Sequence, residues 1–258
     1  MPTALITGAS AGLGAGFARA LAAQDHTLIL TARRTDRLEA LAAELRAAHG
    51  VAVHVLAADL ADPAAPARLL ADIAAAGLTI DLLVNNAGYG ARGDFAALDR
   101  DEQLGMVDLN CRALVALAHG VLPQMIARGS GAILNIASTA AFQPGPWMAV
   151  YYASKAFVLS FSEALHEEVR GSGVRVSALC PGPTRTEFAD RAGMGDMAAF
   201  DAIASDADTV VRDGLAAIRT NSAVKISGAV NTLMADAVRF APRMVARKLA
   251  GSFQKRRG

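Results

Sequence analysis

The sequence predicts a single α/β domain over residues 1–258, a doubly wound sheet of about seven parallel strands with helices on both faces. Short apolar runs of strand length alternate with segments in which apolar residues recur every three or four positions. Several short runs end in glycine, asparagine or aspartate, which turn a chain at the end of a strand. A chain that is 53% hydrophobic and of this length can bury one large core.

Composition narrows the classes of function. The formal net charge is +1 and the basic residues are dispersed, which disfavours nucleic-acid binding. Cys111 and Cys180 lack Cys-x-x-Cys spacing and lie among apolar residues, as core thiols of a reducing compartment do. No signal-peptide pattern and no run of about 18 apolar residues occurs. We expect a cytoplasmic protein that binds a small molecule, with no metal site.

The N-terminal segment is predicted to form a strand, a glycine turn and a helix. Residues 3–7 form the strand, and the turn carries Gly8, Gly12 and Gly14. Glycines let a backbone approach a pyrophosphate, which the N–H groups at the start of the helix would hold. The spacing Gly-x-x-x-Gly-x-Gly departs from the usual dinucleotide fingerprint, so a plain tight turn is the alternative. Its place between the first strand and helix favours a nucleotide.

The next three strands are predicted over residues 27–31, 51–57 and 81–84, each followed by a helix. This alternation requires parallel strands with helices on both faces. Ligands bind such sheets at the carboxyl ends of the strands. The residues expected at those ends are Ala32, Arg33, Arg34, Asp59, Asn85 and Asn86. The alternatives are that the aspartate caps a helix and that the asparagines satisfy turn backbone groups.

A long helix is predicted in the middle of the chain. Asp99-x-x-Glu102 resembles a capping box that opens it, and Pro123 is expected to bend or end it. Asparagine is a poor residue for a helix interior. Asn110 therefore either faces solvent or belongs to a polar network of the site.

The candidate catalytic groups follow a fifth strand, predicted over residues 132–137, which delivers Ser138 at its carboxyl end. Tyr151 and Lys155 are four residues apart, so in a helix they share one face, which Tyr152 does not. We expect Lys155 to lower the pKa of the Tyr151 phenol and so make it a proton donor or acceptor nearer neutral pH. A surface pair is the alternative, since this spacing is common on helices.

The helix that carries these groups is predicted to bury a stripe at four-residue spacing: Ala153, Phe157, Phe161, Leu165 and Val169. A sixth strand over residues 174–180 leads into a sharp turn, residues 181–186, at the same sheet edge. A seventh strand is predicted over residues 223–226. The basic amphipathic segment 229–249 either lies on a membrane or packs on the body or another subunit, and we favour subunit packing.

Residues 187–208 combine apolar side chains with glycines, a composition suited to a lid over the substrate. Phe188 in this segment, with Phe142, Trp147 and Met148, is a candidate for lining an apolar substrate pocket. Ordinary core packing is the alternative for each of these side chains.

Together these motifs resemble the short-chain dehydrogenase/reductase family over nearly the whole chain, and its carbonyl-reducing members closely. Five motifs occur in family order: Thr7-Gly8-x-x-x-Gly12-Leu13-Gly14, Asp59-Leu60, Asn85-Asn86-Ala87-Gly88, Ser138 thirteen residues before Tyr151-x-x-x-Lys155, and Pro181-Gly182. The resemblance implies a Rossmann-type domain with four segments. These are a mainly cofactor-binding half (1–137), a catalytic and nicotinamide-contacting segment (138–186), a substrate lid (187–208) and a C-terminal helix with a basic tail (229–258).

The resemblance also implies roles for individual residues. The implied catalytic set is Asn110, Ser138, Tyr151 and Lys155, in which the asparagine holds a water next to the lysine. The implied cofactor-binding set is Gly8, Ser10, Gly12, Leu13, Gly14, Arg33, Asp59, Leu60, Asn86, Ala87, Gly88, Tyr151, Lys155, Pro181, Gly182, Thr184 and Thr186. Homodimers and homotetramers are common in this family.

The implied reaction is hydride transfer between a nicotinamide cofactor and a ketone or aldehyde, or the reverse oxidation of a secondary alcohol. Folds that select NAD place a carboxylate at the position that resembles Ala32, while Arg33 matches a phosphate, so NADP is expected over NAD. The alternative function is a regulator that binds the dinucleotide without turnover. The intact Ser138, Tyr151 and Lys155 argue against it.

Overall fold

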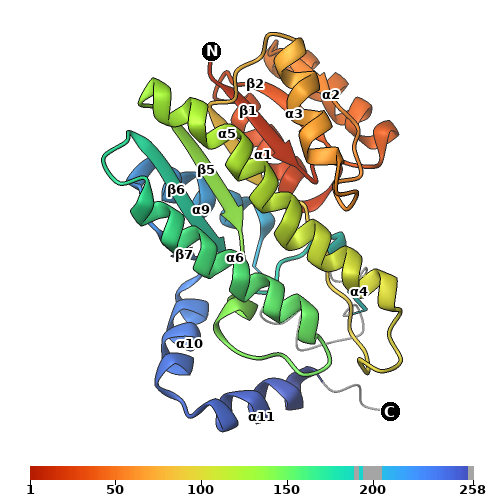
Figure 1. The fold of residues 1–258 in the computed structure, drawn as a ribbon, viewed down its shortest axis with the longest axis vertical. Coiled ribbons are helices and arrows are strands. Elements are labelled where there is room, and N and C mark those ends of the chain that lie inside the picture. Colours follow the sequence, from red (N-terminus) through yellow and green to blue (C-terminus); the bar gives the residue numbers. More distant parts are fainter. Residues whose placement is uncertain (189–191, 194–204, 255–258) are drawn as a thin grey trace.

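The structure, a computed structural model, describes residues 1–188, 192–193 and 205–254. Its centre is a seven-stranded parallel sheet, as the sequence predicted, and the order of its strands is β3-β2-β1-β4-β5-β6-β7. The strands are β1 (Thr3–Thr7), β2 (Thr27–Thr31), β3 (Val53–Val55), β4 (Leu82–Asn85), β5 (Gly131–Ile136), β6 (Val174–Cys180) and β7 (Val224–Ile226). Helices cover both faces of the sheet (Figure 1).

The helices on the two faces are joined to the strands in alternation. They are α1 (Gly12–Ala22), α2 (Thr35–His49), α3 (Ala65–Ala75), α4 (Arg100–Val107), α5 (Leu114–Arg128), α6 (Ala149–Glu168), α9 (Ala207–Thr220), α10 (Ala229–Phe240) and α11 (Arg243–Gln254). A π-helical turn (Asp108–Ala113) joins α4 to α5, and a 3-10 turn (Thr139–Phe142) follows β5.

Alternate side chains of each strand enter two separate cores. On one face, Ile6 of β1 packs in the same cluster as Phe17 of α1. On the other face, its neighbour Leu5 belongs to a cluster with Leu69 of α3 and Leu117 of α5. Each fully buried side chain of this size contributes about 1.5–3 kcal/mol through removal of apolar surface from water. The sheet is therefore held from both sides, which fixes the edge where its strands end.

The long central helix continues further than predicted. Asp99 caps it as expected, accepting a hydrogen bond from the Glu102 N–H at 2.7 Å. Pro123 lies inside α5, which ends only at Arg128. A proline removes the hydrogen bond to the carbonyl four residues earlier, and here that residue, His119, is exposed, so water can satisfy the carbonyl.

The stretch Arg100–Arg128 also has the length and apolar composition of a membrane-spanning helix. In this structure 44% of the most apolar part of this stretch is buried inside the molecule, and α5 packs on α3, β4 and β5. These contacts are those of a core helix in an α/β domain.

The buried stripe predicted for α6 is wrong in its first half. Ala153 is exposed, Phe157 is 45% exposed, and its ring stacks on Phe161 at 6.1 Å. Only Leu165 and Val169 of the predicted stripe are buried. The buried face instead carries Tyr151, Tyr152, Ser154, Lys155, Val158, Leu159 and Ser162. This face carries several polar side chains because it forms a wall of the candidate site. The spacing of the apolar residues therefore predicted a different buried face for α6.

The C-terminal segment forms two helices where one was predicted, because Pro242 interrupts the helix between α10 and α11. Both lie beyond the end of the sheet (Figure 1), and α10 packs on the 3-10 turn after β5 and on β7. Large apolar side chains on them remain exposed: Val230, Leu233, Met234, Phe240, Met244, Val245 and Leu249. The basic tail, residues 255–258, and most of the predicted lid, with Met194, Met197 and Phe200, lie outside the described residues.

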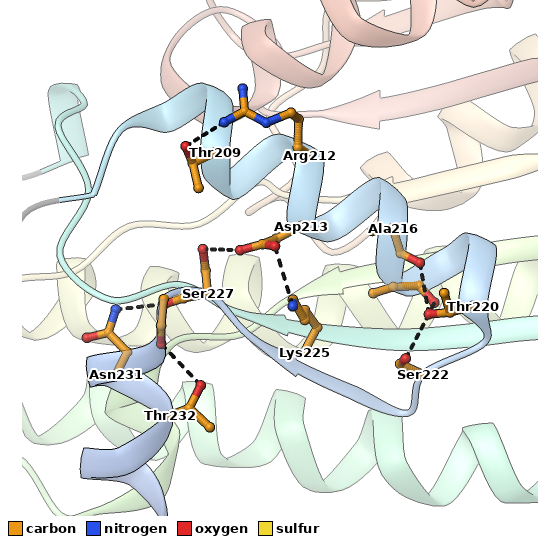
Figure 2. Close-up of polar contacts among 12 residues, drawn as sticks. Thr209, Arg212, Asp213, Ala216, Thr220, Ser222, Lys225, Ser227, Asn231 and Thr232 are labelled. Carbon is orange, nitrogen blue, oxygen red and sulfur yellow. Dashed lines mark hydrogen bonds and ion pairs between the residues drawn. The ribbon is translucent and has the colours of Figure 1, made fainter.

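Polar contacts fix the start of α10 to the domain (Figure 2). The buried Ser227 donates a hydrogen bond to Asp213 of α9 at 2.6 Å, and Lys225 of β7 lies 3.4 Å from the same carboxylate. Asn231 of α10 donates to the Ser227 carbonyl at 2.7 Å. Asn231 also lies against Gly182, where an added Cβ would come within 2.4 Å of its amide nitrogen. The start of α10 thus packs against the turn that follows β6.

Candidate functional site

A cleft of about 730 Å³ runs along the carboxyl ends of the strands. The turns after β1, β2, β4, β5 and β6 all contribute to its walls. Its size is within the range of cavities that hold small molecules and cofactors. The cleft lies where the strand order reverses between β1 and β4, the usual ligand position in open α/β sheets.

The glycine turn after β1 forms one end of the cleft. Gly8 and Gly12 have φ values of +66° and +54°, a region that favours glycine. A Cβ on Gly14 would approach the Gly8 carbonyl oxygen to 2.3 Å. Asn86 fixes the turn from the neighbouring β4 loop by donating its amide to the Thr7 carbonyl at 2.8 Å.

This turn fits the phosphates of a dinucleotide. α1 begins directly at the turn, and its N-cap residue Ala11 supplies no side-chain hydrogen bond. The first N–H groups of the helix therefore receive no acceptor from the N-cap side chain. They lie at the positive, N-terminal end of the helix dipole, and this end borders the cleft. Backbone N–H groups and a positive helix end are the usual partners of a pyrophosphate.

Ser138 and Tyr151 both line the cleft, and the interaction with Ser138 lowers the pKa of the Tyr151 phenol. Ser138 begins the 3-10 turn after β5, and its oxygen accepts from the Ala140 N–H at 3.1 Å. Its hydroxyl lies 3.4 Å from the Pro181 carbonyl, a long contact that leaves it able to turn toward a ligand. Tyr151 is 8% exposed, so its phenol acts in a nearly water-free environment.

Lys155 lies one turn further along α6 and is also buried, at 6% exposure. Its ammonium group donates to the Ile136 carbonyl at 2.7 Å and lies 5.9 Å from the centre of the Tyr151 ring. The helix therefore does bring the phenol and the ammonium group to one face, as the four-residue spacing predicted.

The pKa of Tyr151 moves in the opposite direction from the sequence-based prediction. Burial raises the pKa of the phenol above that of a free tyrosine, and this effect exceeds the lowering by the Ser138 hydrogen bond. Burial lowers the pKa of Lys155 to about 8, so its positive charge is itself costly in this environment. The chain alone thus keeps the phenol protonated, which suits a proton donor.

Asn110 lies in the π-helical turn between α4 and α5 and is 1% exposed. Its amide oxygen accepts from the Tyr89 N–H at 3.1 Å, and its amide nitrogen donates to the Tyr89 carbonyl and to Ser154, both at 3.0 Å. The side chain therefore ties the loop after β4 to α6. Of the two alternatives for Asn110, the structure shows the polar network, and π-helical turns often mark such functional places.

Charged side chains gather at the end of the cleft near β2. Arg33 lies 3.8 Å from Asp59, and Asp59 also accepts from the Ala61 N–H at 3.1 Å, so it forms a local turn and does not cap α3. Arg34 donates to the Ser10 hydroxyl at 3.2 Å. Both arginines line the cleft.

Most of the predicted site residues lie in this cleft. Those that line it are Gly8, Ser10, Gly12, Leu13, Arg33, Asp59, Leu60, Asn86, Ala87, Gly88, Ser138, Tyr151, Lys155, Pro181, Gly182, Thr184, Thr186 and Phe188. Gly14 and Asn110 lie behind the wall and support it. Within the described residues no cluster of His, Cys, Asp or Glu could hold a metal ion.

Two predicted substrate residues lie elsewhere. Phe142 packs in a core cluster beside Val158, with the Arg239 guanidinium 5.5 Å from its ring, and Trp147 is on the surface at 37% exposure. Of the aromatic candidates, only Phe188 reaches the cleft, with its ring 5.3 Å from that of Tyr151. Phe142 and Trp147 both belong to the segment between Ser138 and Tyr151, in which Gln143 and Met148 line the cleft and these two side chains do not.

Sequence reasoning missed several residues of the cleft. These are Gln143, Tyr152 and Glu187, whereas Met148, which also lines the cleft, was among the side chains expected at the substrate pocket. Tyr152 could have been predicted as a cleft residue, because it directly follows Tyr151, the candidate proton donor, in the sequence. For Glu187 no local signal exists, because its partners are about 150 residues away in the chain.

Comparisons with known proteins match this geometry. A family profile described as "short chain dehydrogenase" matches residues 2–196. The chain belongs to the short-chain dehydrogenase/reductase family. It is 41% identical over 204 residues to a protein named sulfoacetaldehyde reductase 2 from Chromohalobacter salexigens, covering 78% of this chain and 80% of that one.

The descriptions of two further relatives name a cofactor. The chain is 39% identical over 195 residues to NADP-dependent 3-hydroxy acid dehydrogenase YdfG of Escherichia coli, covering 74% of this chain and 77% of that one. A solved short-chain dehydrogenase from Sphingobium yanoikuyae in complex with NADPH has a TM-score of 0.83 and 38% identity, covering 93% and 94% of the two chains. As a member of this family, the chain is an oxidoreductase that acts on alcohol or carbonyl groups with a nicotinamide dinucleotide.

We predict that Lys155→Met stabilises the cofactor-free protein at about pH 7 and that this gain shrinks toward about pH 10. Because burial lowers the pKa of Lys155 from 10.5 to about 8, the unfolded chain holds a proton between these values that the folded chain has lost. The free energy of unfolding of the unmodified protein therefore rises with pH in that window, by at most about 3 kcal/mol.

Urea unfolding of both proteins across this range measures the difference, with the exposed Lys248→Met as the matched control. A difference between Lys155→Met and the unmodified protein that does not change with pH would show that the Lys155 ammonium group is hydrated.

Proposed function

We propose that the protein reduces an apolar ketone or aldehyde with NADPH, or oxidises the corresponding secondary alcohol in reverse. The observation that carries this proposal is that Ser138, Tyr151 and Lys155 line one cleft, with the Lys155 ammonium group 5.9 Å from the centre of the Tyr151 ring. Apolar and aromatic side chains that pack with Tyr151 in the cleft wall include Met148, Tyr152 and Phe188. This composition supports an apolar substrate.

In the proposed reaction the chain orients the carbonyl oxygen of the substrate and gives it a proton. When bound, the nicotinamide cofactor supplies the hydride. Tyr151 donates its phenolic proton to the oxygen, and Ser138 donates a hydrogen bond to the same oxygen as negative charge develops there. Lys155, protonated below its pKa of about 8, stabilises the phenolate that remains on Tyr151.

Asn110 has a supporting role in this proposal. Its side chain binds Tyr89 and Ser154, is 1% exposed and does not line the cleft, so it does not reach the substrate. It keeps the loop after β4 and the start of α6 at a fixed separation, and the cleft lies between these two segments. We therefore assign it to positioning.

We predict that Tyr151→Phe lowers kcat about a hundredfold or more and leaves the affinity for NADPH nearly unchanged, because it removes a proton and no phosphate contact. Turnover with a panel of ketones and aldehydes, together with NADPH fluorescence titration, measures both quantities. Tyr152→Phe removes the adjacent phenol, which lacks the spacing to Lys155, and should lower kcat much less. A Tyr151→Phe enzyme that keeps most of its kcat would exclude the proposed proton donor.

We predict a preference of ten- to a hundredfold for NADPH over NADH in kcat/KM, because a charge-assisted hydrogen bond contributes about 1.5–3 kcal/mol. Two relatives named for NADP or solved with NADPH support this cofactor. The Arg33 side chain is half-exposed at the cleft, and its contact with Asp59 is long, at 3.8 Å. Its guanidinium group can therefore turn to a phosphate. Arg33→Ala should weaken the use of NADPH and spare that of NADH.

The complementary variant is Ala32→Asp, which introduces the carboxylate typical of NAD selection and should reverse the preference. Kinetics with both cofactors tests both variants. Equal use of the two cofactors by the unmodified enzyme would contradict the proposed preference, and indifference to both substitutions would show that Arg33 does not contact the cofactor.

We also propose that the enzyme is a homodimer or homotetramer in which α10 and α11 pack on another subunit. The support is their exposed apolar side chains, of which Leu233 is 71% and Phe240 is 89% exposed. We predict that Leu233→Asp shifts the mass measured by light scattering toward the monomer. Vesicle flotation tests the alternative, since a protein that stays monomeric and binds vesicles through these helices would contradict subunit packing.

A further inference from the structure

The Glu187 carboxylate lies between two arginines from the opposite side of the cleft. One of its oxygens is 3.0 Å from Nη1 of Arg34, and the other is 2.5 Å from Nη1 of Arg37. Glu187 follows the turn after β6, whereas Arg34 and Arg37 belong to the start of α2. Each carboxylate oxygen thus has its own guanidinium group, and the contact joins two segments that are far apart in the sequence.

The arginines form a seat for an anion together with one hydroxyl group. Arg34 donates from Nε and Nη2 to the Ser10 hydroxyl, at 3.3 and 3.2 Å. We call Ser10, Arg34 and Arg37 the arginine seat. Its donors surround a place that suits a group with two or three anionic oxygens, and the positive end of α2 lies beside it. In this structure the occupant of that place is the protein's own carboxylate.

The contacts of Glu187 are of a kind that a ligand can replace. The side chains of Glu187, Arg34 and Arg37 are 53%, 43% and 46% exposed. Ion pairs with this exposure hold their partners weakly, because water screens the attraction and the side chains lose freedom. The arginines nevertheless keep the pKa of Glu187 below its usual value, so the competing carboxylate is ionised at neutral pH.

We propose that Glu187 is an internal competitor for the phosphate group on the adenosine ribose of the cofactor. Its carboxylate occupies the arginine seat in the free protein and leaves it when the phosphate binds. A phosphate monoester carries more charge and more acceptor oxygens than a carboxylate, and two anions in one seat repel each other. This inference rests on the proposed use of NADP.

The competition sets the selectivity between the two cofactors. A nucleotide that carries the ribose phosphate must displace Glu187, so part of its attraction to the arginines is offset. A nucleotide without that phosphate leaves the ion pairs of Glu187 in place. Glu187 therefore moderates the affinity for the phosphorylated cofactor without changing the affinity for the other.

Glu187→Gln tests the competition, because it keeps the size of the side chain and removes its charge. The probes are adenosine 2′,5′-bisphosphate, which carries the ribose phosphate, and adenosine 5′-monophosphate, which lacks it. Isothermal titration of the full chain with each probe gives the dissociation constants without any turnover. We expect Glu187→Gln to bind the bisphosphate about three- to tenfold more tightly and the monophosphate within about twofold of the unmodified protein.

The matched control is Glu39→Gln, which removes the same charge from an exposed position on α2 and should leave both affinities unchanged. Unchanged or weaker binding of the bisphosphate by Glu187→Gln would overturn the inference. Weaker binding of the monophosphate would also overturn it, and would show that Glu187 accepts hydrogen bonds from the ribose.

The two proposals fail in different ways. If the unmodified protein binds the bisphosphate no more tightly than the monophosphate, the proposed NADP preference fails. The competition still stands in that case if Glu187→Gln gains affinity for the bisphosphate alone.

Discussion

The parallel pairing of β1 with β4 is the constraint on which the site depends. At this pair the order of the strands reverses, so the helices that follow β1 and β4 lie on opposite faces and leave a crevice between them. Hydrogen bonds from Asn86 to the carbonyls of Thr7 and Gly8 hold the two turns together at the head of the crevice. Because both strands are buried on two faces, this edge cannot shift without loss of the two cores.

The polar face of α6 is the second requirement. Helices usually bury their apolar side, but α6 buries Tyr151 and Lys155 and exposes Phe157. The buried polar groups are satisfied by specific partners, such as the Ile136 carbonyl for Lys155 and the Asn135 amide for Ser162. Burial then controls their chemistry, since it raises the pKa of Tyr151 and lowers that of Lys155.

Charge is concentrated at the opposite end of the cleft from these groups. Arg33 and Arg34 face the cleft from β2 and α2, and the carboxylates of Asp59 and Glu187 pair with them from two other segments. Such exposed pairs add little to stability. Their arrangement instead places cations where an anionic part of a nucleotide would lie, with acidic groups that a ligand has to share or displace.

The sequence by itself determined the order of strands and helices, the glycine turn and the spacing of Tyr151 and Lys155. These features depend on contacts between residues near each other in the chain, and a local pattern records them. Only the tertiary structure decided which face of α6 is buried, that Asn110 binds Tyr89, and that Glu187 meets Arg34 and Arg37. It also reversed the expected pKa of Tyr151, because desolvation depends on everything that surrounds a group and not on its neighbours in sequence.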